Sequence, residues 1–350
     1  MRLSRVAERW LRLRVDAAYL LLLLLLLLSV ASPTQGLRLA EKKCQEYIKA
    51  NTETSYGGPL TLDSTVSEFH SVNCTQSVDL IVNGEAAGRG EFPHQAVLGY
   101  LKANSTTDYH WQCGGSLISD KFVMTAAHCG TPAVVRLGAH DLWEESDIDI
   151  NYDVAEFIKH PDYKVKLSYN DLALVRLTWP VEFSPAIRPA CLWTTVPLNI
   201  TTVLATGFGF TDFAINASSV LMKVNLDVLA RSGCEQKLEF DRKFKQGIIG
   251  EQLCVGSLKG RKDTCQGDSG GPIQVVSALE TCMYHVVGVT STGGTCGVGR
   301  SESVYTQVAS YIDWIERVVW EDEIKDQGEE AVKRSGGLWV FPDQLPTPTQ

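Results

Sequence analysis

Three polar residues, far apart in the chain, have the types that nucleophilic catalysis requires. Ser269 stands in a Gly-Asp-Ser-Gly-Gly segment, His128 in a Thr-Ala-Ala-His-Cys segment, and Asp171 in an Asn-Asp-Leu-Ala-Leu segment. A serine hydroxyl is a poor nucleophile at neutral pH, so it needs an imidazole that accepts its proton. The imidazole in turn needs a carboxylate that fixes its tautomer and orientation. These residues are therefore candidates for the three roles.

The segments around these residues resemble those of the trypsin/chymotrypsin family of serine endopeptidases. The chain order of histidine, aspartate and serine is also the order in that family, and it differs from the order in subtilisins and α/β-hydrolases. The resemblance implies that Ser269 is the nucleophile, His128 the general base and Asp171 its orienting partner. It further implies that the backbone N–H groups of Gly267 and Ser269 form the oxyanion hole.

A carboxylate six residues before the serine points to the class of substrate. In trypsin-like members this position forms the floor of the primary pocket and pairs with substrate Arg or Lys, and here it is Asp263. The resemblance assigns the opposite wall of the pocket to residues of two later segments. These residues are Ser291, Thr292, Gly293 and Ser303.

Two of the wall residues depart from the family pattern. Ser303 stands where glycine usually leaves the pocket open, and Thr292 replaces the usual aromatic residue. A hydroxymethyl group at Ser303 narrows the pocket near Asp263, although it is also able to hydrogen-bond a bound cation. We expect cleavage after Arg, and less often after Lys, with a preference that Ser303 modifies.

The segment Ile81-Val82-Asn83-Gly84 resembles the new N-terminus that family members expose when they are cut. The resemblance implies that the freed α-amine of Ile81 pairs with Asp268, the residue before the nucleophile. The pair forms only once the amine exists, and its formation orders the oxyanion hole and the pocket. Because Leu80 precedes the cut where Lys or Arg is usual, we expect a separate activating protease that cuts after leucine.

The chain has ten cysteines, and the family resemblance implies how most of them pair. Three disulfides follow from it: Cys113 with Cys129, Cys234 with Cys254, and Cys265 with Cys296. In the family the position of Cys191 tethers the prosegment, and Cys74 is its expected partner, so the cleaved prosegment would stay attached. Cys44 and Cys282 remain and are paired by elimination.

Parts of the chain look like the Snake-like branch of arthropod clip-domain proteases. The resemblance rests on the segments at 44–48 and 282–291 and on the cleavage site after Leu80. Such relatives act in extracellular cascades of immunity, melanisation or embryonic patterning. A clip domain needs six cysteines, whereas only Cys44 and Cys74 precede Ile81, so the resemblance covers residues 40–320 without the clip module.

The elements that must position the catalytic residues are mainly strands. From residue 81 to 307, short runs rich in Val, Ile, Leu and Thr are broken by Gly, Pro, Asn and Asp, which is the spacing of an all-β domain. Apolar residues at helical spacing then predict an amphipathic helix over 308–320. The resemblance implies the same class of fold, two six-stranded antiparallel β-barrels with a C-terminal helix.

Both ends of the chain fall outside the protease domain, which we place at residues 81–320. The first 36 residues combine an Arg-rich opening, nine consecutive leucines (20–28) and small residues after them. The apolar run is shorter than a bilayer span, so it predicts a signal peptide cleaved after Ala31 or Gly36. Residues 37–80 are expected to be a prosegment with a linker, and residues 321–350 a disordered tail.

The signal peptide predicts a secreted, extracellular protein. Disulfides persist in that compartment, and sequons there become available for glycosylation. The chain has four sequons, at Asn73, Asn104, Asn199 and Asn216. The formal net charge of −9 and the absence of long basic runs argue against nucleic acid as a partner.

No cofactor or metal is expected from the cysteine spacing, with one alternative. An acidic loop, 139–149, occupies the place where some relatives bind calcium. Ala139 in this loop stands where one carboxylate is expected. A calcium site at the loop is therefore the weaker interpretation of its acidic residues.

Together these features predict a secreted trypsin-like zymogen that cuts proteins, including downstream zymogens, in an extracellular cascade and that serpins inhibit. Three alternatives stay open: a non-catalytic homologue that acts as a binding cofactor, a digestive protease, and a surface protein anchored by residues 20–28. Non-catalytic homologues lose a member of the triad, whereas all three residues are present here. A tethered prosegment and Leu80 favour regulation over digestion.

Overall fold

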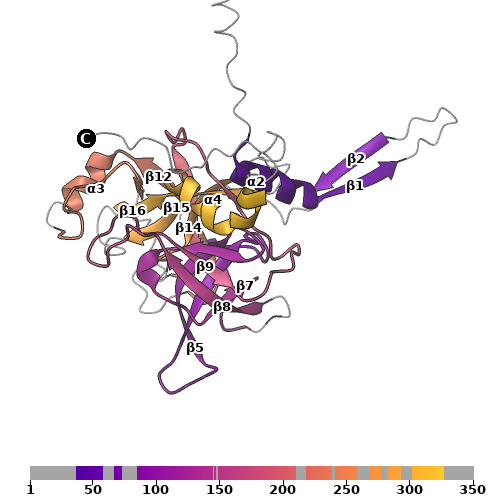
Figure 1. The fold of residues 1–350 in the computed structure, drawn as a ribbon, viewed down its shortest axis with the longest axis horizontal. Helices are drawn as coiled ribbons and strands as arrows, with labels where there is room; N and C mark the ends of the chain where they lie inside the picture. The colour runs from indigo at the N-terminus through magenta and orange to yellow at the C-terminus, as the bar shows by residue number, and fades with distance from the viewer. Residues whose placement is uncertain are drawn as a thin grey trace, which may run out of the picture. The chain divides into compact units, whose positions relative to one another are not determined.

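The computed structural model describes residues 37–57, 67–72, 85–144, 146, 149–209, 218–238, 241–257, 268–276, 283–292 and 302–326. The chain divides into two units, Met1–Arg38 and Leu39–Gln350, and every helix and strand described below belongs to the second. Strands dominate this unit and close into two barrels (Figure 1).

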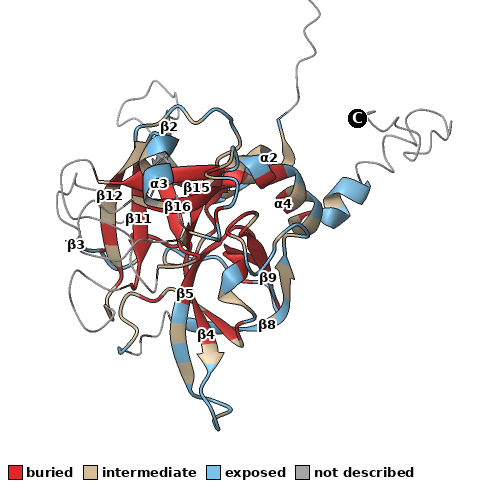
Figure 2. Ribbon diagram, turned by 90° about the vertical axis from the view of Figure 1, so that its left-hand side faces the viewer, coloured by how far each residue is buried: buried red, intermediate tan, exposed pale blue. Residues whose placement is uncertain are grey.

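The first barrel contains the strands next to the histidine and the aspartate. Its strands are β4 (Gln95–Leu101), β5 (Tyr109–Leu117), β6 (Phe122–Thr125), β7 (Val134–Leu137), β8 (Ile150–Lys159) and β9 (Ala173–Leu177). All neighbours are antiparallel, in the closed order β4-β5-β6-β9-β8-β7. Small and branched side chains fill the interior, among them Ala96, Val123, Val135 and Val175, all fully buried (Figure 2).

The second barrel contains the segment that follows Ser269. Its strands are β11 (Thr202–Gly207), β12 (Met222–Leu229), β13 (Gln252–Gly256), β14 (Pro272–Val276), β15 (Tyr284–Thr292) and β16 (Glu302–Gln307). Antiparallel pairing runs β15-β14-β11-β12-β13-β16, and β16 pairs with β15, which closes the ring. Two short strands, β10 (Cys191–Leu192) and β3 (Glu85–Ala86), add to β15 and β12. The prediction of two six-stranded antiparallel barrels is confirmed.

A helix ends the described part of the chain, as the apolar spacing predicts. It begins with a 3₁₀ turn, η2 (Val308–Tyr311), and continues as α4 (Ile312–Val319), whose Ile312 and Ile315 face the core. Residues 321–326 are helical as well, so the predicted disorder is wrong for these residues. Residues 327–350 lie outside the described part.

A helix docked on the barrels precedes them, where the sequence predicts a prosegment with a linker. This helix, α2 (Leu39–Ala50), lies beside α4, and its Ala40 belongs to the same buried cluster as Trp320 (Figure 1). Two strands follow it, β1 (Thr52–Gly57) and β2 (Ser67–Val72), which pair in antiparallel register. The first part of the predicted prosegment is therefore folded.

Polar contacts hold α2 against the C-terminal helical residues. The backbone N–H of Ala40 donates to Glu316 Oε1 at 2.9 Å, which satisfies one of the free donors in the first turn of α2. Lys43 Nζ lies 2.8 Å from Glu323 Oε1. Residues 321–326 thus have a partner, which a sequence rich in charged residues does not reveal.

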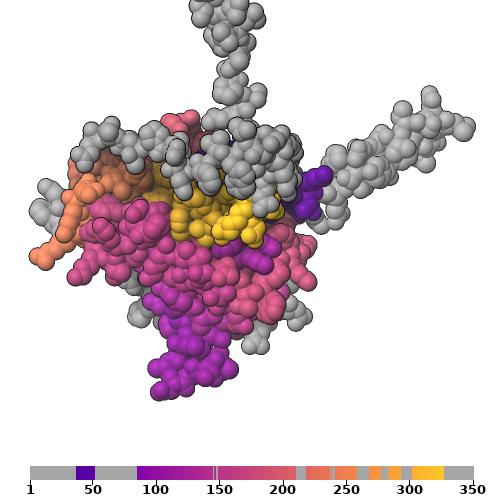
Figure 3. Space-filling model, in the orientation of Figure 1, coloured from indigo at the N-terminus to yellow at the C-terminus, as the bar shows by residue number. Residues whose placement is uncertain are grey.

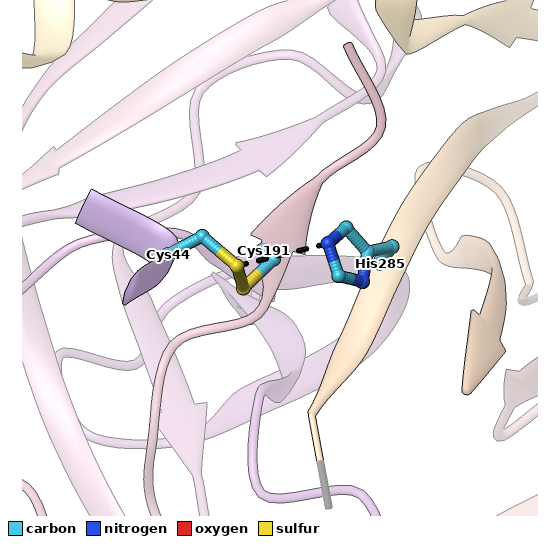
Figure 4. Close-up of side chains that lie close together, drawn as sticks. All are labelled: Cys44, Cys191 and His285. Carbon is cyan, nitrogen blue, oxygen red and sulfur yellow. Dashed lines mark hydrogen bonds between the residues drawn. A yellow bond between two sulfur atoms is a disulfide. The ribbon is translucent and has the colours of Figure 1, made fainter. Parts of the chain in front are cut away.

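A disulfide joins Cys44 of α2 to Cys191 of β10 (Figure 4). The Cα atoms are 5.0 Å apart, and His285 Nε2 lies 3.6 Å from Cys44 Sγ. This bond shows that two expected pairings, Cys74 with Cys191 and Cys44 with Cys282, are wrong. The reason is the docking of α2, which places the earlier cysteine of the prosegment against β10.

The other disulfides of the described residues are those that the family resemblance implies. They join Cys113 to Cys129 and Cys234 to Cys254. The predicted pair of Cys265 and Cys296 lies outside the described residues.

The Cys44–Cys191 bond predicts a specific product and a specific loss of stability. Digestion without reduction should yield a cross-linked peptide pair that holds Cys44 and Cys191. Cys44→Ala/Cys191→Ala should lower the free energy of unfolding by about 2–4 kcal/mol, since the disulfide restricts the unfolded chain. Cys74→Ala is the control and should keep the cross-linked pair; a peptide pair of Cys74 with Cys191 in the natural chain would contradict the assignment.

Candidate active site

The pairing of β6 with β9 brings His128 and Asp171 together. Thr125, the last residue of β6, pairs with Ala173, the first residue of β9. His128 follows in the 3₁₀ turn η1 (Ala127–Cys129), and Asp171 lies two residues before β9. Because the strands are antiparallel, the chain leaves β6 and enters β9 at the same end, where the two side chains meet.

Asp171 accepts two hydrogen bonds from His128, one from the imidazole ring and one from the backbone. Its Oδ2 accepts from His128 Nδ1 at 2.7 Å, and its Oδ1 accepts from the backbone N–H of His128 at 2.9 Å. The Asp171 side chain is 3% exposed, whereas that of His128 is 33% exposed. With Nδ1 bound to the carboxylate, Nε2 is the ring nitrogen left to accept a proton.

The second barrel completes the surroundings of Asp171. The hydroxyl of Ser291 in β15 donates to Asp171 Oδ2 at 2.6 Å, and the hydroxyl of Thr306 in β16 donates to its backbone oxygen at 2.9 Å. Tyr311 Oη donates to Asn170 Oδ1 at 3.0 Å, which holds Asn170 in its left-handed conformation (φ 52°). A buried carboxylate needs such donors, because desolvation otherwise makes its charge costly.

Ser269 lies in the turn before β14, and its backbone is held against the first barrel. Its carbonyl oxygen accepts the N–H of Gly114 in β5 at 2.8 Å and lies 3.7 Å from Cys129 Sγ, one residue after the histidine. Gly270 has φ 77°, and a Cβ there would lie 2.2 Å from Thr125 Oγ1. Only glycine fits this turn. The structure thus brings all three triad candidates to the junction of the barrels.

The carboxylate of Asp268 lies against a glycine segment at the end of β11. Its Oδ1 accepts the backbone N–H of Gly209 at 2.9 Å. A Cβ on Gly207 would lie 2.0 Å from Asp268 Oδ1, and one on Gly209 would lie 2.5 Å from the carboxylate carbon. The two glycines are therefore required for the carboxylate to occupy this place; its predicted partner, Ile81, lies outside the described residues.

Three of the residues predicted to line the pocket are described, namely Ser291, Thr292 and Ser303. Ser291 contributes its hydroxyl to Asp171, a contact that the pocket-wall prediction did not include. Ser303 is 1% exposed on β16 and pairs with Val255 of β13, while Thr292 ends β15 and is partly buried. The other predicted site residues lie outside the described part of the chain: Leu80, Asp263, Gly267 and Gly293.

A buried polar network beside the site has no signal in the sequence. His94 Nε2 is hydrogen-bonded to Gln274 Oε1 of β14, Gln274 Nε2 donates to Thr206 Oγ1 of β11, and Thr206 Oγ1 donates to Gln95 Oε1 of β4. The network crosses from the first barrel to the second. Its members are up to 180 residues apart, so only the packed barrels reveal it.

Among the described residues, the acidic loop at 139–149 has one buried carboxylate. Both oxygens of Asp149 are buried without a hydrogen-bond partner, and burial raises the pKa of this carboxyl. Glu144 is exposed and pairs with Arg89 at 2.7 Å. Calcium usually takes about six to eight oxygen ligands, and one free carboxylate supplies few of them. The calcium site therefore stays a prediction and gains no support from these residues.

Two clusters of histidine and cysteine come close enough to hold a metal ion, but disulfides occupy them. They are Cys44, Cys191 and His285, and Cys113, His128 and Cys129. The thiolate is the form of cysteine that binds metal, and these sulfurs are oxidised.

Two of the four sequons lie on the described surface. Asn199 is exposed, and so is Asn104 in the turn that joins β4 and β5, which projects from the molecule (Figure 3). Asn73 and Asn216 lie outside the described residues. None of the described helices is long and apolar enough to span a bilayer, and residues 20–28 are not among them.

The buried network predicts how stability depends on pH. Desolvation lowers the pKa of His94 to about 4, so between about pH 6.5 and pH 4 the unfolded chain binds a proton that the folded chain excludes. The stability from the neutral ring is therefore present above pH 6.5 and is lost as the pH falls, at up to about 1.4 kcal/mol per pH unit.

His94→Gln should remove about 2 kcal/mol of the decline in unfolding free energy between about pH 6.5 and pH 4.5, measured by urea unfolding. His110→Gln changes an exposed histidine of β5 and should keep the decline of the natural chain. An equal decline in the His94 variant and the natural chain would contradict the assignment.

Comparison with known proteins agrees with this geometry. The trypsin family profile matches residues 81–315. The chain is 41% identical over 290 residues to serine protease snk of Drosophila melanogaster, a match that covers 81% of this chain and 65% of snk. It is 34% identical to the clotting factor G beta subunit of Tachypleus tridentatus (69% of this chain, 80% of that protein). It is also 34% identical to trypsin V-B of Rattus norvegicus (74% and 96%). The chain therefore belongs to the trypsin family of serine proteases.

Proposed function

We propose that the chain is the secreted zymogen of a trypsin-like serine endopeptidase. The observation that carries the proposal is the 2.7 Å contact between Asp171 and His128, located beside the backbone of Ser269. In this arrangement Nε2 of His128 accepts the proton of the Ser269 hydroxyl as its oxygen attacks the substrate carbonyl. Asp171 stabilises the imidazolium that forms.

The remaining steps use the same residues. The backbone N–H groups of Gly267 and Ser269 would stabilise the negative oxygen of the tetrahedral intermediate. His128 then returns its proton to the leaving amine, and the acyl group stays on Ser269. Water, deprotonated by His128, releases the acyl group and restores the serine.

Cleavage between Leu80 and Ile81 would activate the enzyme. The new α-amine of Ile81 would pair with Asp268, whose carboxylate already lies against Gly207 and Gly209. A buried charge requires an opposite charge, so the amine and the carboxylate stabilise each other only after the cut. Since Asp268 directly precedes Ser269, this pair would set the conformation of the oxyanion hole.

The prosegment would remain with the enzyme after activation. Cys44 is bonded to Cys191, and Ala40 belongs to a buried cluster shared with the C-terminal helix. Ala40 and Cys44 precede the proposed cleavage site, whereas the residues that they contact follow it, so these contacts would join the two products of the cut. An attached prosegment suits a protease that stays at its place of action more than it suits a digestive enzyme.

We place the enzyme in an extracellular proteolytic cascade, where it would cut protein substrates after Arg and less often Lys. Asp263 would supply the charge of the primary pocket, and the buried Ser303 would narrow it. Leu80 requires an activating protease of different specificity. The name of one relative, the clotting factor G beta subunit, supports a cascade role, in which downstream zymogens and serpins are the expected partners.

Cutting the purified chain at Leu80–Ile81 is the experiment that tests this function. The cut chain should react with a fluorophosphonate at Ser269 and hydrolyse peptides after Arg or Lys, whereas the uncut chain should do neither. Ser269→Ala should abolish labelling. Stoichiometric labelling of that variant would refute Ser269 as the nucleophile. Equal hydrolysis of peptides whatever residue precedes the cleaved bond would refute the role of Asp263 in the pocket. A cut chain that is not labelled would favour the binding cofactor.

The contact between Ser291 and Asp171 predicts a defect in the chemical step. Ser291→Ala removes a hydrogen bond to a buried carboxylate, so kcat should fall about tenfold to a hundredfold while KM changes little. Ser119→Ala removes a buried hydroxyl that accepts the backbone N–H groups of Lys121 and Phe122 in its own turn, and it should leave kcat unchanged. An equal kcat for both variants would contradict the positioning role of Ser291.

A further inference from the structure

Two exposed loops beside Asp171 are joined into one surface. The first, residues 161–168, ends three residues before Asp171, and the second, residues 241–247, leads from α3 (Arg231–Leu238) toward β13. The backbone N–H of Ser168 donates to Lys243 O at 3.2 Å. Tyr169 Oη accepts the N–H of Gln246 at 2.7 Å and donates to the carbonyl of the next residue at 3.1 Å. We call these two segments the basic loops.

The basic loops concentrate positive charge in an acidic protein. They hold five exposed cations and two carboxylates, Asp162 and Asp241, while the whole chain has a formal net charge of −9. The cations are Lys164, Lys166, Arg242, Lys243 and Lys245. Within the described residues, no ion pair joins any of the five to a carboxylate. An anion brought to this surface would therefore not have to displace an internal partner.

Hydroxyl groups line the path from the basic loops to the triad. Thr292 Oγ1 donates to Ser168 Oγ at 3.3 Å, and Ser168 O accepts from Gln252 Nε2 at 2.6 Å, which fixes the first loop to β13. Thr292 directly follows Ser291, whose hydroxyl is bound to Asp171. Position 292, next to the triad, thus offers a partly buried hydroxyl where an aromatic side chain would offer an apolar platform.

We propose that the basic loops bind an acidic segment of the protein substrate within a few residues of the cleaved bond. This inference rests on the proposed function, because it assigns the loops to the substrate of the same site. Carboxylates of an extended peptide that reaches the triad would pass close to the lysines and to the partly buried hydroxyl of Thr292. Charge complementarity of this kind raises association rates and selects among substrates, and it weakens with salt.

A sulfated polysaccharide is the other polyanion with suitable charge. It fits the surface less well, because the cations lie on only two short loops, the first of which ends three residues before Asp171, and the chain as a whole repels anions. A short acidic peptide segment needs only a few nearby cations.

The test uses the activated full chain and two peptides that share one cleavage site. In the first peptide Glu residues flank the site on both sides, and in the second Gln residues replace them. At about 50 mM salt the natural enzyme should prefer the Glu peptide by about threefold to tenfold in kcat/KM, and at about 500 mM the ratio should approach one. Lys166→Glu/Lys243→Glu should abolish or reverse the preference. Lys42→Glu/Lys121→Glu makes the same change in net charge at two other exposed lysines and should keep it.

Each outcome decides the inference. The inference is overturned if the enzyme cleaves both peptides equally. It is also overturned if the substitutions at Lys166 and Lys243 leave the ratio of kcat/KM between the two peptides unchanged. Binding of a sulfated polysaccharide to the loops without any Glu preference would overturn it as well. Fluorophosphonate labelling separates the two levels of failure. A labelled enzyme without Glu preference contradicts only the role of the basic loops, whereas an unlabelled cut chain contradicts the proposed function and this inference with it.

Discussion

The structure depends most on one buried carboxylate at the junction of two barrels. Asp171 is 2% exposed, and an ionised group in such a position is stable only when donors surround it. The first barrel supplies two donors through His128, and the second supplies the hydroxyl of Ser291. The barrels must therefore meet in one arrangement for the charge to be satisfied, and the same arrangement sets Ser269 against Gly114. Stability and the proposed chemistry rest on one set of contacts.

The α2 helix, which precedes the proposed cleavage site, belongs to this folded unit. Ala40 is buried with the C-terminal helix, and Cys44 is bonded to Cys191 on a strand that extends the second barrel. The α2 helix thus lies on the barrels in the uncut chain. The proposed activation would then act on Asp268, while the disulfide of Cys44 with Cys191 keeps α2 attached.

Charged residues differ between the interior of the barrels and the basic loops. The chain is acidic overall, and some of its buried charges are paired, as in the contact of Lys223 with Glu91 at 2.7 Å. The exposed cations of the basic loops differ from this pair, since none of them forms an ion pair within the described residues. Asp263 would select one residue of the substrate, and the basic loops would select its neighbours. The two preferences would together determine which substrates are cut, because they act on different side chains of one bound peptide.

The sequence by itself determined the residues that can carry the chemistry and the type of fold around them. The segments at His128 and Ser269 have strong local patterns, and the spacing of strands and of the helix after 308 is also local, since side-chain periodicity follows backbone geometry. The family resemblance added the bonds Cys113–Cys129 and Cys234–Cys254.

Only the tertiary structure decided which distant side chains meet. Cys44 bonds Cys191 across 147 residues, Ser291 reaches Asp171 across 120, and His94 reaches Gln274 across 180. Residues 321–326 are helical beside α2, and two separate basic segments form one surface only because Tyr169 and Ser168 hold them together. Such contacts depend on how complete barrels and helices pack, and the local order of residues does not encode that packing.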